Sequence, residues 1–358
     1  MKLHRSAWIW PGVVLVACHA PAWSQDTIRY TDRKTMKEAT ATGTIAEESP
    51  SQVVYKPGAT AGTKEIPALD ILDVKYEVPG AAKLAYNRAA AEERLSADPT
   101  AKDADRKKSL GDAIKSYQEI LPRLVEGKLK FAARHVQYKV ARLLTRQAED
   151  DSEQRAAAIE ALSKFITQNP DGWQINQAAR TLARLQLDKE DPAAAQKTYE
   201  DLAATPRIPD QVRKECDLLI AEALIRGKKF SEAQNKLETI LHSVGADEVQ
   251  ATRVRIYLAG CLGASGKLPE AVAQLNGIIA KTTDKGVLSL AYNTLGDCYR
   301  LNKKNGDAVW PYLWVDVIYH QDREEHWKAM EHLAKLFDDL GDKSKAKQYR
   351  ERLKKEGR

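Results

Sequence analysis

The sequence predicts a mostly α-helical protein, in which a small all-β module is followed by an α-α superhelical solenoid. Three observations lead to this prediction. β-Branched residues and turn formers alternate between residues 26 and 78, good helix formers dominate after residue 80, and alanines recur in that second part at a nearly fixed step. With 358 residues, 43% of them hydrophobic, the chain is long enough to bury a core.

The first 24 residues have the three parts of an export signal. A basic start with Lys2 and Arg5 precedes an apolar run over residues 7–17, and small residues follow. The apolar run is shorter than the roughly 20 residues that a membrane-spanning helix needs, so we expect no transmembrane span. The sequence therefore predicts an exported protein of the periplasm or cell envelope, with residues 1–24 outside the fold.

Two processing schemes are open for this signal. Small residues at Ala20-Pro21-Ala22 or at Ala22-Trp23-Ser24 would let a signal peptidase release a soluble protein. Alternatively, Leu15-Val16-Ala17-Cys18 resembles the lipobox of bacterial lipoproteins, in which the cysteine is lipidated. Acyl chains on Cys18 would then anchor the protein to a membrane surface.

Residues 26–78 are predicted to form the small β module. Its alternating or β-branched segments TIRY, ATATGTIAE, SQVVYK and LDILDVKYE are separated by Pro, Gly and Ser, which favour turns. Four or five short strands in this length resemble an SH3-like barrel or a meander. No ligand-binding motif stands out, so we expect a cap or docking module that ends at Val78-Pro79-Gly80.

After residue 80 the main feature is an internal repeat. Alanines in the same setting step by 45 residues once and then by 37 or 38, and apolar residues follow each of them at four and seven positions, on one helix face. About seven helical hairpins over residues 81–358 follow from this spacing. Gly227, Gly266 and Gly341 are expected to be left-handed caps of first helices. The anchor alanines are Ala113, Ala158, Ala195, Ala233, Ala271, Ala308 and Ala346.

This pattern resembles the tetratricopeptide repeat (TPR), with each unit stretched to about 38 residues. HEAT-like hairpins have a similar length and are the minor alternative. The resemblance implies a non-enzymatic scaffold that binds protein or peptide in the concave groove of its first helices. With the export signal, the architecture also resembles TPR proteins of the bacterial envelope. The residues that match the TPR signature most closely are Tyr292, Leu295, Gly296, Tyr299, Ala308 and Tyr312.

Carried over position by position, the resemblance also implies which side chains face the groove. A solvated charged face is the alternative for each of them, and the Lys and Asn pattern that clamps a terminal carboxylate in some TPR proteins is not reproduced. The implied groove residues are Arg180, Arg184, Leu187, Leu218, Glu222, Ile225, Arg226, Asn293, Asp297, Arg300, Glu331, Lys335 and Asp338.

The sequence has no catalytic signature: no phosphate-binding Gly-rich loop, no H-E-x-x-H, no G-x-S-x-G and no C-x-x-C occurs. We therefore expect neither an enzyme nor a cofactor. The cysteines after the signal, Cys216, Cys261 and Cys298, are expected to be buried, and a bridge between the last two is not favoured. The histidines at 320, 326 and 332 step by six, which spreads them around a helix, so no metal site is expected.

Aromatic residues gather in the last third of the chain. Trp310, Trp314 and Trp327, together with Tyr312 and Tyr319, form its densest aromatic cluster. They either pack between the last two hairpins or form a patch that docks a partner, because aromatic residues commonly anchor interfaces.

The charges are nearly balanced and evenly spread. The 56 basic residues against 50 acidic ones give a formal charge of +6, without the clustered Lys and Arg of a nucleic-acid binder. The leading hypothesis is thus an exported scaffold with a protein or peptide partner. A glycan-associated structural protein of the cell wall and an accessory subunit of an envelope enzyme complex are the alternatives.

Overall fold

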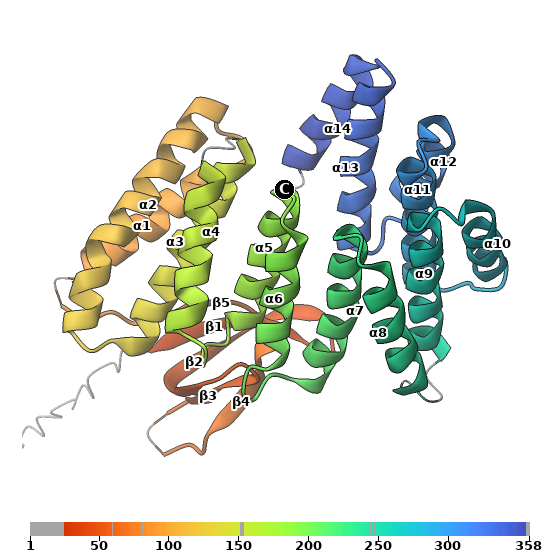
Figure 1. Ribbon diagram of the computed structural model, residues 1–358. Coiled ribbons are helices and arrows are strands. Elements are labelled where there is room, and N and C mark those ends of the chain that lie inside the picture. Colours follow the sequence, from red (N-terminus) through yellow and green to blue (C-terminus); the bar gives the residue numbers. More distant parts are fainter. Residues whose placement is uncertain are drawn as a thin grey trace, which may run out of the picture.

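The computed structural model describes residues 25–58, 60–80, 82–150, 154–243, 245 and 248–355 (Figure 1). The predicted signal at residues 1–24, including Cys18, lies outside these residues. None of the helices in the described ranges is long and apolar enough to cross a membrane.

The β module is a single antiparallel sheet with the strand order β4-β3-β2-β1-β5. The first four strands form a meander, and the short helix η1 (Ala68–Asp70) then leads the chain back so that β5 pairs with β1, as in SH3-like barrels. β2 is long and bends where its pairing with β3 shifts register, between Ile45 and Glu47. The predicted all-β module is confirmed. Its strands are β1 (Asp26–Asp32), β2 (Lys37–Glu48), β3 (Gln52–Lys56), β4 (Lys64–Pro67) and β5 (Ile71–Lys75).

Fourteen α-helices follow within the described residues, and consecutive helices pair into seven antiparallel hairpins. The predicted mostly α solenoid is confirmed. The helices are α1 (Ala82–Ser96), α2 (Asp103–Glu126), α3 (Lys130–Asp150), α4 (Gln154–Gln168), α5 (Ile175–Asp188), α6 (Pro192–Ala203), α7 (Asp210–Arg226), α8 (Phe230–Ser243), α9 (Glu248–Ala264), α10 (Leu268–Ile279), α11 (Lys285–Leu301), α12 (Asn305–Val317), α13 (Arg323–Asp339) and α14 (Lys343–Lys355).

Each of the seven anchor alanines lies in the second helix of its hairpin, from Ala113 in α2 to Ala346 in α14, and each is 0% exposed. A side chain of one carbon lets the second helix approach its neighbours closely. Gly296 does the same for the first helix α11, because a Cβ at this position would lie 2.6 Å from Cζ of Tyr312 in α12. The alanine repeat in the sequence thus marks the positions at which the helices cross.

The turns inside the last five hairpins share a left-handed residue five positions before the anchor alanine. Gly266 and Gly341 take this role with φ angles of 91° and 84°, as predicted. The prediction for Gly227 is wrong: its φ is −76°, and the next residue, Lys228, is left-handed with a φ of 58°. The position is therefore fixed by the turn geometry, and it is filled by Glu190, Lys228, Gly266, Lys303 and Gly341.

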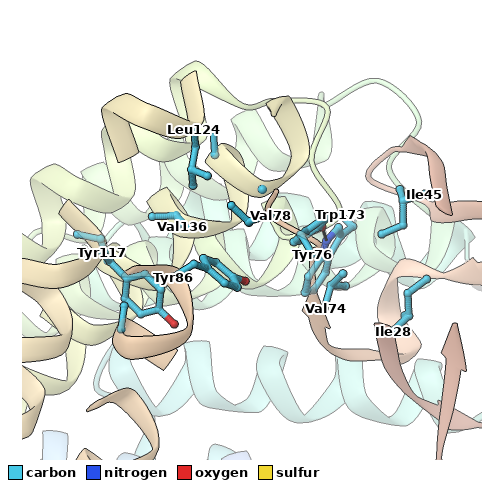
Figure 2. Close-up of a cluster of buried hydrophobic side chains, with 14 of the residues drawn as sticks. Ile28, Ile45, Val74, Tyr76, Val78, Tyr86, Tyr117, Leu124, Val136 and Trp173 are labelled. Atoms are coloured by element: carbon cyan, nitrogen blue, oxygen red, sulfur yellow. Dashed lines mark hydrogen bonds between the residues drawn. The ribbon is translucent and has the colours of Figure 1, made fainter. Parts of the chain in front are cut away.

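One apolar core joins the β module to the first three helices. It contains Ile28 and Ile45 of the sheet together with Tyr117 of α2 and Val136 of α3. Figure 2 shows Trp173, from the loop between α4 and α5, beside Tyr76 at the centre of this cluster. The sheet is thus packed onto the start of the solenoid, whereas the later hairpins have smaller cores of their own.

Candidate functional site

The array curls until its last hairpin faces hairpins near its start. Nζ of Lys328 in α13 lies 3.6 Å from Glu222 Oε2 in α7, six helices earlier, and Lys355 of α14 lines the same groove as residues of α3 and α5. The curl encloses a groove of about 1110 Å³. Side chains of α3, α5, α7 and α13 line most of it, with contributions from the ends of α1 and α14.

Seven of the thirteen implied groove residues line this groove. From α5 come Arg180, Arg184 and Leu187, each one turn of helix after the last, as expected for one helix face. The others that line it are Glu222 and Arg226 of α7 and Glu331 and Lys335 of α13. Those outside the lining are Leu218, Ile225, Asn293, Asp297, Arg300 and Asp338.

The α11 residues lie outside the groove because α13 covers their face of the helix. The Asn293 side chain is buried, and its amide donates to the backbone oxygen of Glu325 at 2.9 Å and to Oε2 of the same residue at 2.7 Å. Asn293 therefore joins two neighbouring first helices, and it does not face an incoming ligand.

Asp297 of α11 is likewise occupied by protein groups. Its Oδ1 accepts hydrogen bonds from Tyr312 at 2.8 Å and from Arg300 at 3.0 Å, and it lies 3.4 Å from Nε2 of His332. Burial raises the pKa of Asp297, but these neighbours outweigh it and hold the pKa at about 2. Burial also lowers the pKa of His332 to about 4, so this imidazole is uncharged at neutral pH. Arg300 and Tyr312 are therefore the effective partners of Asp297 at neutral pH.

The groove concentrates positive charge. Its lining has nine Lys and Arg side chains against four Asp and Glu side chains, an excess of five, while His332 is neutral above about pH 4. The nearly balanced composition of the whole chain gave no sign of this excess. The nine cationic residues are Arg106, Arg142, Arg146, Arg180, Arg184, Arg226, Lys328, Lys335 and Lys355.

Some of these cations are held by acidic side chains outside the groove. Arg142 pairs with Glu93 at 2.6 Å, and Arg180 pairs with Glu215 at 2.8 Å. Burial raises the pKa of Glu93, but Lys139 and Arg142 outweigh it and lower that pKa below its ordinary value. These two arginines are therefore fixed in position on the groove wall.

Glu222 serves two groove cations at once. It lies 3.1 Å from Arg226 and 3.6 Å from Lys328, so one of the four acidic side chains of the lining is already shared between them. Among the residues that the structure describes, Arg184, Lys335 and Lys355 have no hydrogen-bonding or ion-pair partner. These three side chains can therefore pair with anionic groups of a ligand.

The three tryptophans of the predicted docking patch are divided between two places. Trp327 lines the groove, and the guanidinium of Arg323 lies 4.3 Å from the centre of its ring. Trp310 and Trp314 lie on α12 outside the groove lining, 68% and 46% exposed, so core packing does not account for them. Trp314 stacks on Tyr292 and Tyr319 with ring centres 5.9 Å and 6.4 Å away.

The three cysteines that the structure describes lie in the first helices α7, α9 and α11. Cys216, Cys261 and Cys298 are free and buried. Burial raises their pKa values to about 11, 11 and 12, which leaves the thiols protonated and poorly nucleophilic at neutral pH. Within the described residues, no group of three or more His, Cys, Asp or Glu side chains could hold a metal ion.

A second polar cluster, which the sequence did not suggest, lies where the β module meets the helices. Arg134 of α3 is 1% exposed, and its Nη1 donates to Glu48 Oε2 of β2 at 3.2 Å and to the backbone oxygen of Asp171 at 3.1 Å. The Tyr76 hydroxyl also donates to Glu48 and accepts from Trp173 Nε1 at 3.2 Å. All these groups face one another, so the cluster joins two parts of the fold and offers no open site.

Comparison with known proteins finds solved structures of low similarity only. No family model and no curated protein matches this chain. Similar solved structures include a tetratricopeptide repeat protein from Parabacteroides merdae, at 15% identity and a TM-score of 0.43, which covers 76% of this chain and 94% of that one.

Two further solved structures show lower similarity. YrrB, "a TPR protein with an unusual peptide-binding site", matches at 16% identity and a TM-score of 0.31, covering 64% of this chain and 97% of its own. PilW, a "widely conserved type IV pilus biogenesis factor", matches at 15% identity and a TM-score of 0.30, covering 59% of this chain and 90% of its own. The TPR-like architecture of this chain rests on its own geometry: in the described residues, seven stacked hairpins each bury an anchor alanine at the helix crossing.

Proposed function

We propose that the protein is an exported, non-enzymatic scaffold of the bacterial cell envelope that binds a protein or peptide in its groove. The observation that carries the proposal is the groove of about 1110 Å³, lined by four helices that are far apart in the sequence. Stacked hairpins bury their faces against their neighbours and leave a long curved surface, which suits an extended ligand. The β module, packed on the first helices, is a second contact surface or an end cap.

The groove is tested by placing a photo-activatable cross-linking amino acid at Gln177, an exposed residue of its lining. Lys164, exposed on α4 and outside the lining, is the matched control position. We expect one dominant protein adduct in envelope extracts from Gln177 and none from Lys164. Equal adduct patterns at the two positions would contradict binding in the groove.

The export part of the proposal rests on the composition of residues 1–24 and has its own test. The mass of the mature amino terminus distinguishes the schemes: cleavage after Ala22 or Ser24 gives a soluble envelope protein, and a lipid-modified Cys18 gives a membrane-anchored one. An unprocessed chain that begins at Met1 would remove the envelope assignment.

A second candidate, a structural protein that binds wall glycan, is favoured by three stacked aromatic rings, Tyr292 of α11, Trp314 of α12 and Tyr319 just after α12. The Tyr292 ring lies nearly parallel to those of Trp314 and Tyr319, with interplanar angles of 16° and 15°. Sugar rings pack their C–H faces on exposed aromatic surfaces of this kind. Co-sedimentation with purified cell wall that is lost in the Trp314→Ala variant would support this candidate over the groove.

A further inference from the structure

We infer that the groove receives an acidic, extended segment of a partner protein. This inference rests on the proposed function and names the chemistry of the ligand. It starts from the lining, which carries five more cationic than acidic side chains in a chain whose total excess is only six. The curl of the solenoid brings these charges from separate hairpins to one surface.

The three cations without partners show which groups a ligand would satisfy. Arg184 is half-buried on α5, Lys335 lies on α13 and Lys355 ends α14, so they come from different parts of the lining. A ligand that covers them removes water from their charged groups, which is costly unless the ligand supplies anions. The planar guanidinium of Arg184 matches the two oxygens of a carboxylate.

In the described part of the chain, none of the four acidic side chains of the lining forms an ion pair with Arg184, Lys335 or Lys355. Glu222 is already shared by Arg226 and Lys328, and Glu93 and Glu215, which hold Arg142 and Arg180, lie outside the lining. The paired cations are thereby held in place before a ligand arrives, which reduces the entropy cost of binding. The cations without partners then form the ion pairs with the ligand.

The mixed character of the lining favours a peptide over a nucleic acid. Leu187, Leu219 and Trp327 place apolar and aromatic surface between the charges of the lining. The sugar-phosphate backbone of a nucleic acid carries no apolar groups that would pack against this surface. Asp188 and Glu324 would repel the phosphates that pass beside them, because every nucleotide carries a charge. A peptide can instead place carboxylates at the free cations and apolar side chains between them.

The test selects binders from a random-peptide phage library on the immobilised protein without its signal. We expect the selected sequences to be enriched in Asp and Glu relative to the library. The best peptide is then labelled and its affinity measured by fluorescence anisotropy, beside a version with Asn and Gln at every acidic position. The acidic peptide should bind at least about tenfold more tightly, and its affinity should fall as salt is added.

Charge reversal on the protein locates the contact. The double variant Arg184→Glu and Lys335→Glu should bind the acidic peptide at least about tenfold more weakly. Lys164→Glu, which also replaces an exposed cation but outside the groove, should bind as the wild type does. A neutral double variant, Arg184→Gln and Lys335→Gln, should be intermediate, and circular dichroism should show all three folded.

The outcomes separate this inference from the function on which it rests. Selected peptides that are neutral or basic, but whose binding is lost in a Leu187→Asp variant, would leave the groove as a peptide site and overturn its acidic preference. Selection of no peptide, together with no adduct at Gln177, would overturn both. A single-stranded oligonucleotide that displaces the peptide and binds more tightly would overturn the choice of a peptide.

Discussion

The two ends of this molecule are held together in different ways. In the N-terminal part, the β module, α1, α2, α3 and Trp173 share one large core, and buried charges bridge the sheet and the helices. From α5 onwards the hairpins are held by a series of smaller cores, each formed by neighbouring helices. The first part depends on contacts between residues far apart in the sequence, and the second mostly on contacts between neighbours.

This difference predicts different responses to damage. A change in the shared N-terminal core should weaken the sheet and the first helices together. A change in one later hairpin should loosen mainly that hairpin, because the stability of a repeat array is roughly a sum over units and their interfaces. Hydrogen exchange, followed peptide by peptide, separates the two responses.

The largest effect is expected for Arg134→Ala. At pH 8, above the folded pKa of Glu48, this change leaves the Glu48 carboxylate buried without its cation and removes the hydrogen bond to the backbone oxygen of Asp171. Loss of one partner of a buried ion pair typically costs about 3 to 5 kcal/mol. We expect urea unfolding at lower concentration, with faster exchange in both β2 and α3 and unchanged exchange in α11.

Arg207 provides the matched control, because its ion pair joins the same end of β2 to the helices. Arg207 Nη1 lies 2.7 Å from Glu47 Oε1, but both side chains are about half exposed. Arg207→Ala should therefore cost only about 0 to 1 kcal/mol. If the two variants lose the same stability, burial does not set the strength of this junction.

The second prediction concerns the pH dependence of the same junction. Burial raises the pKa of Glu48 from 4.5 to about 7, against the opposing effects of Tyr76 and Arg134. Between these two values the unfolded chain ionises Glu48 while the folded protein keeps it protonated. Its contribution is thus complete below about pH 4.5 and is lost as the pH rises through about 7, a fall of about 3 kcal/mol.

Glu48→Gln removes this titration and keeps one acceptor oxygen, which replaces one of the two carboxylate oxygens that accept from Tyr76 and Arg134. Between pH 4.5 and 8, the wild type should lose about 3 kcal/mol more unfolding free energy than the variant, as measured by urea unfolding. Parallel pH profiles would show that Glu48 stays ionised in the folded protein.

These N-terminal contacts are also the part of the fold that the sequence could not reveal. The anchor alanines, the hairpins and most strands followed from periodicity, because each depends on neighbours within one or two helices. β4 is only four residues long and ends in Pro67, so it lacked a visible alternation. The pairing of Arg134 with Glu48 spans 86 positions and leaves no local pattern.

The candidate site divides in the same way. Arg180 and Arg184 could be placed on the groove because the resemblance to the TPR implies which positions of a first helix face it. Lys328 and Lys355 could not, because small rotations between hairpins add up before α13 and α14 reach α5 and α7. The cationic character of the groove therefore appears only with the curvature of the whole array.

The third prediction tests the local character of the later hairpins. Gly296→Ala places a methyl group against the ring of Tyr312, at a distance that real Cβ contacts rarely reach, and overpacking of this kind costs about 2 kcal/mol. Exchange should increase in α11 and α12 and stay unchanged in β2. Gly277→Ala in α10, where the added carbon meets nothing within 4 Å, should instead raise stability by up to about 1 kcal/mol. Faster exchange in β2 after Gly296→Ala would mean that the two parts unfold as one.

The smallest effect concerns the left-handed residue five positions before the anchor alanine. Lys303 has a φ of 60°, which strains a side chain with a Cβ, whereas Gly266 fills the same position without strain. Lys303→Gly should therefore raise the free energy of unfolding by about 0.5 to 1 kcal/mol, and Gly266→Lys should lower it by about 1 kcal/mol. Lys304, the next residue, has a φ of −95°, so Lys304→Gly should give no gain. If Lys303→Gly and Lys304→Gly change the urea midpoint alike, the side chain and not the backbone sets the preference at this turn.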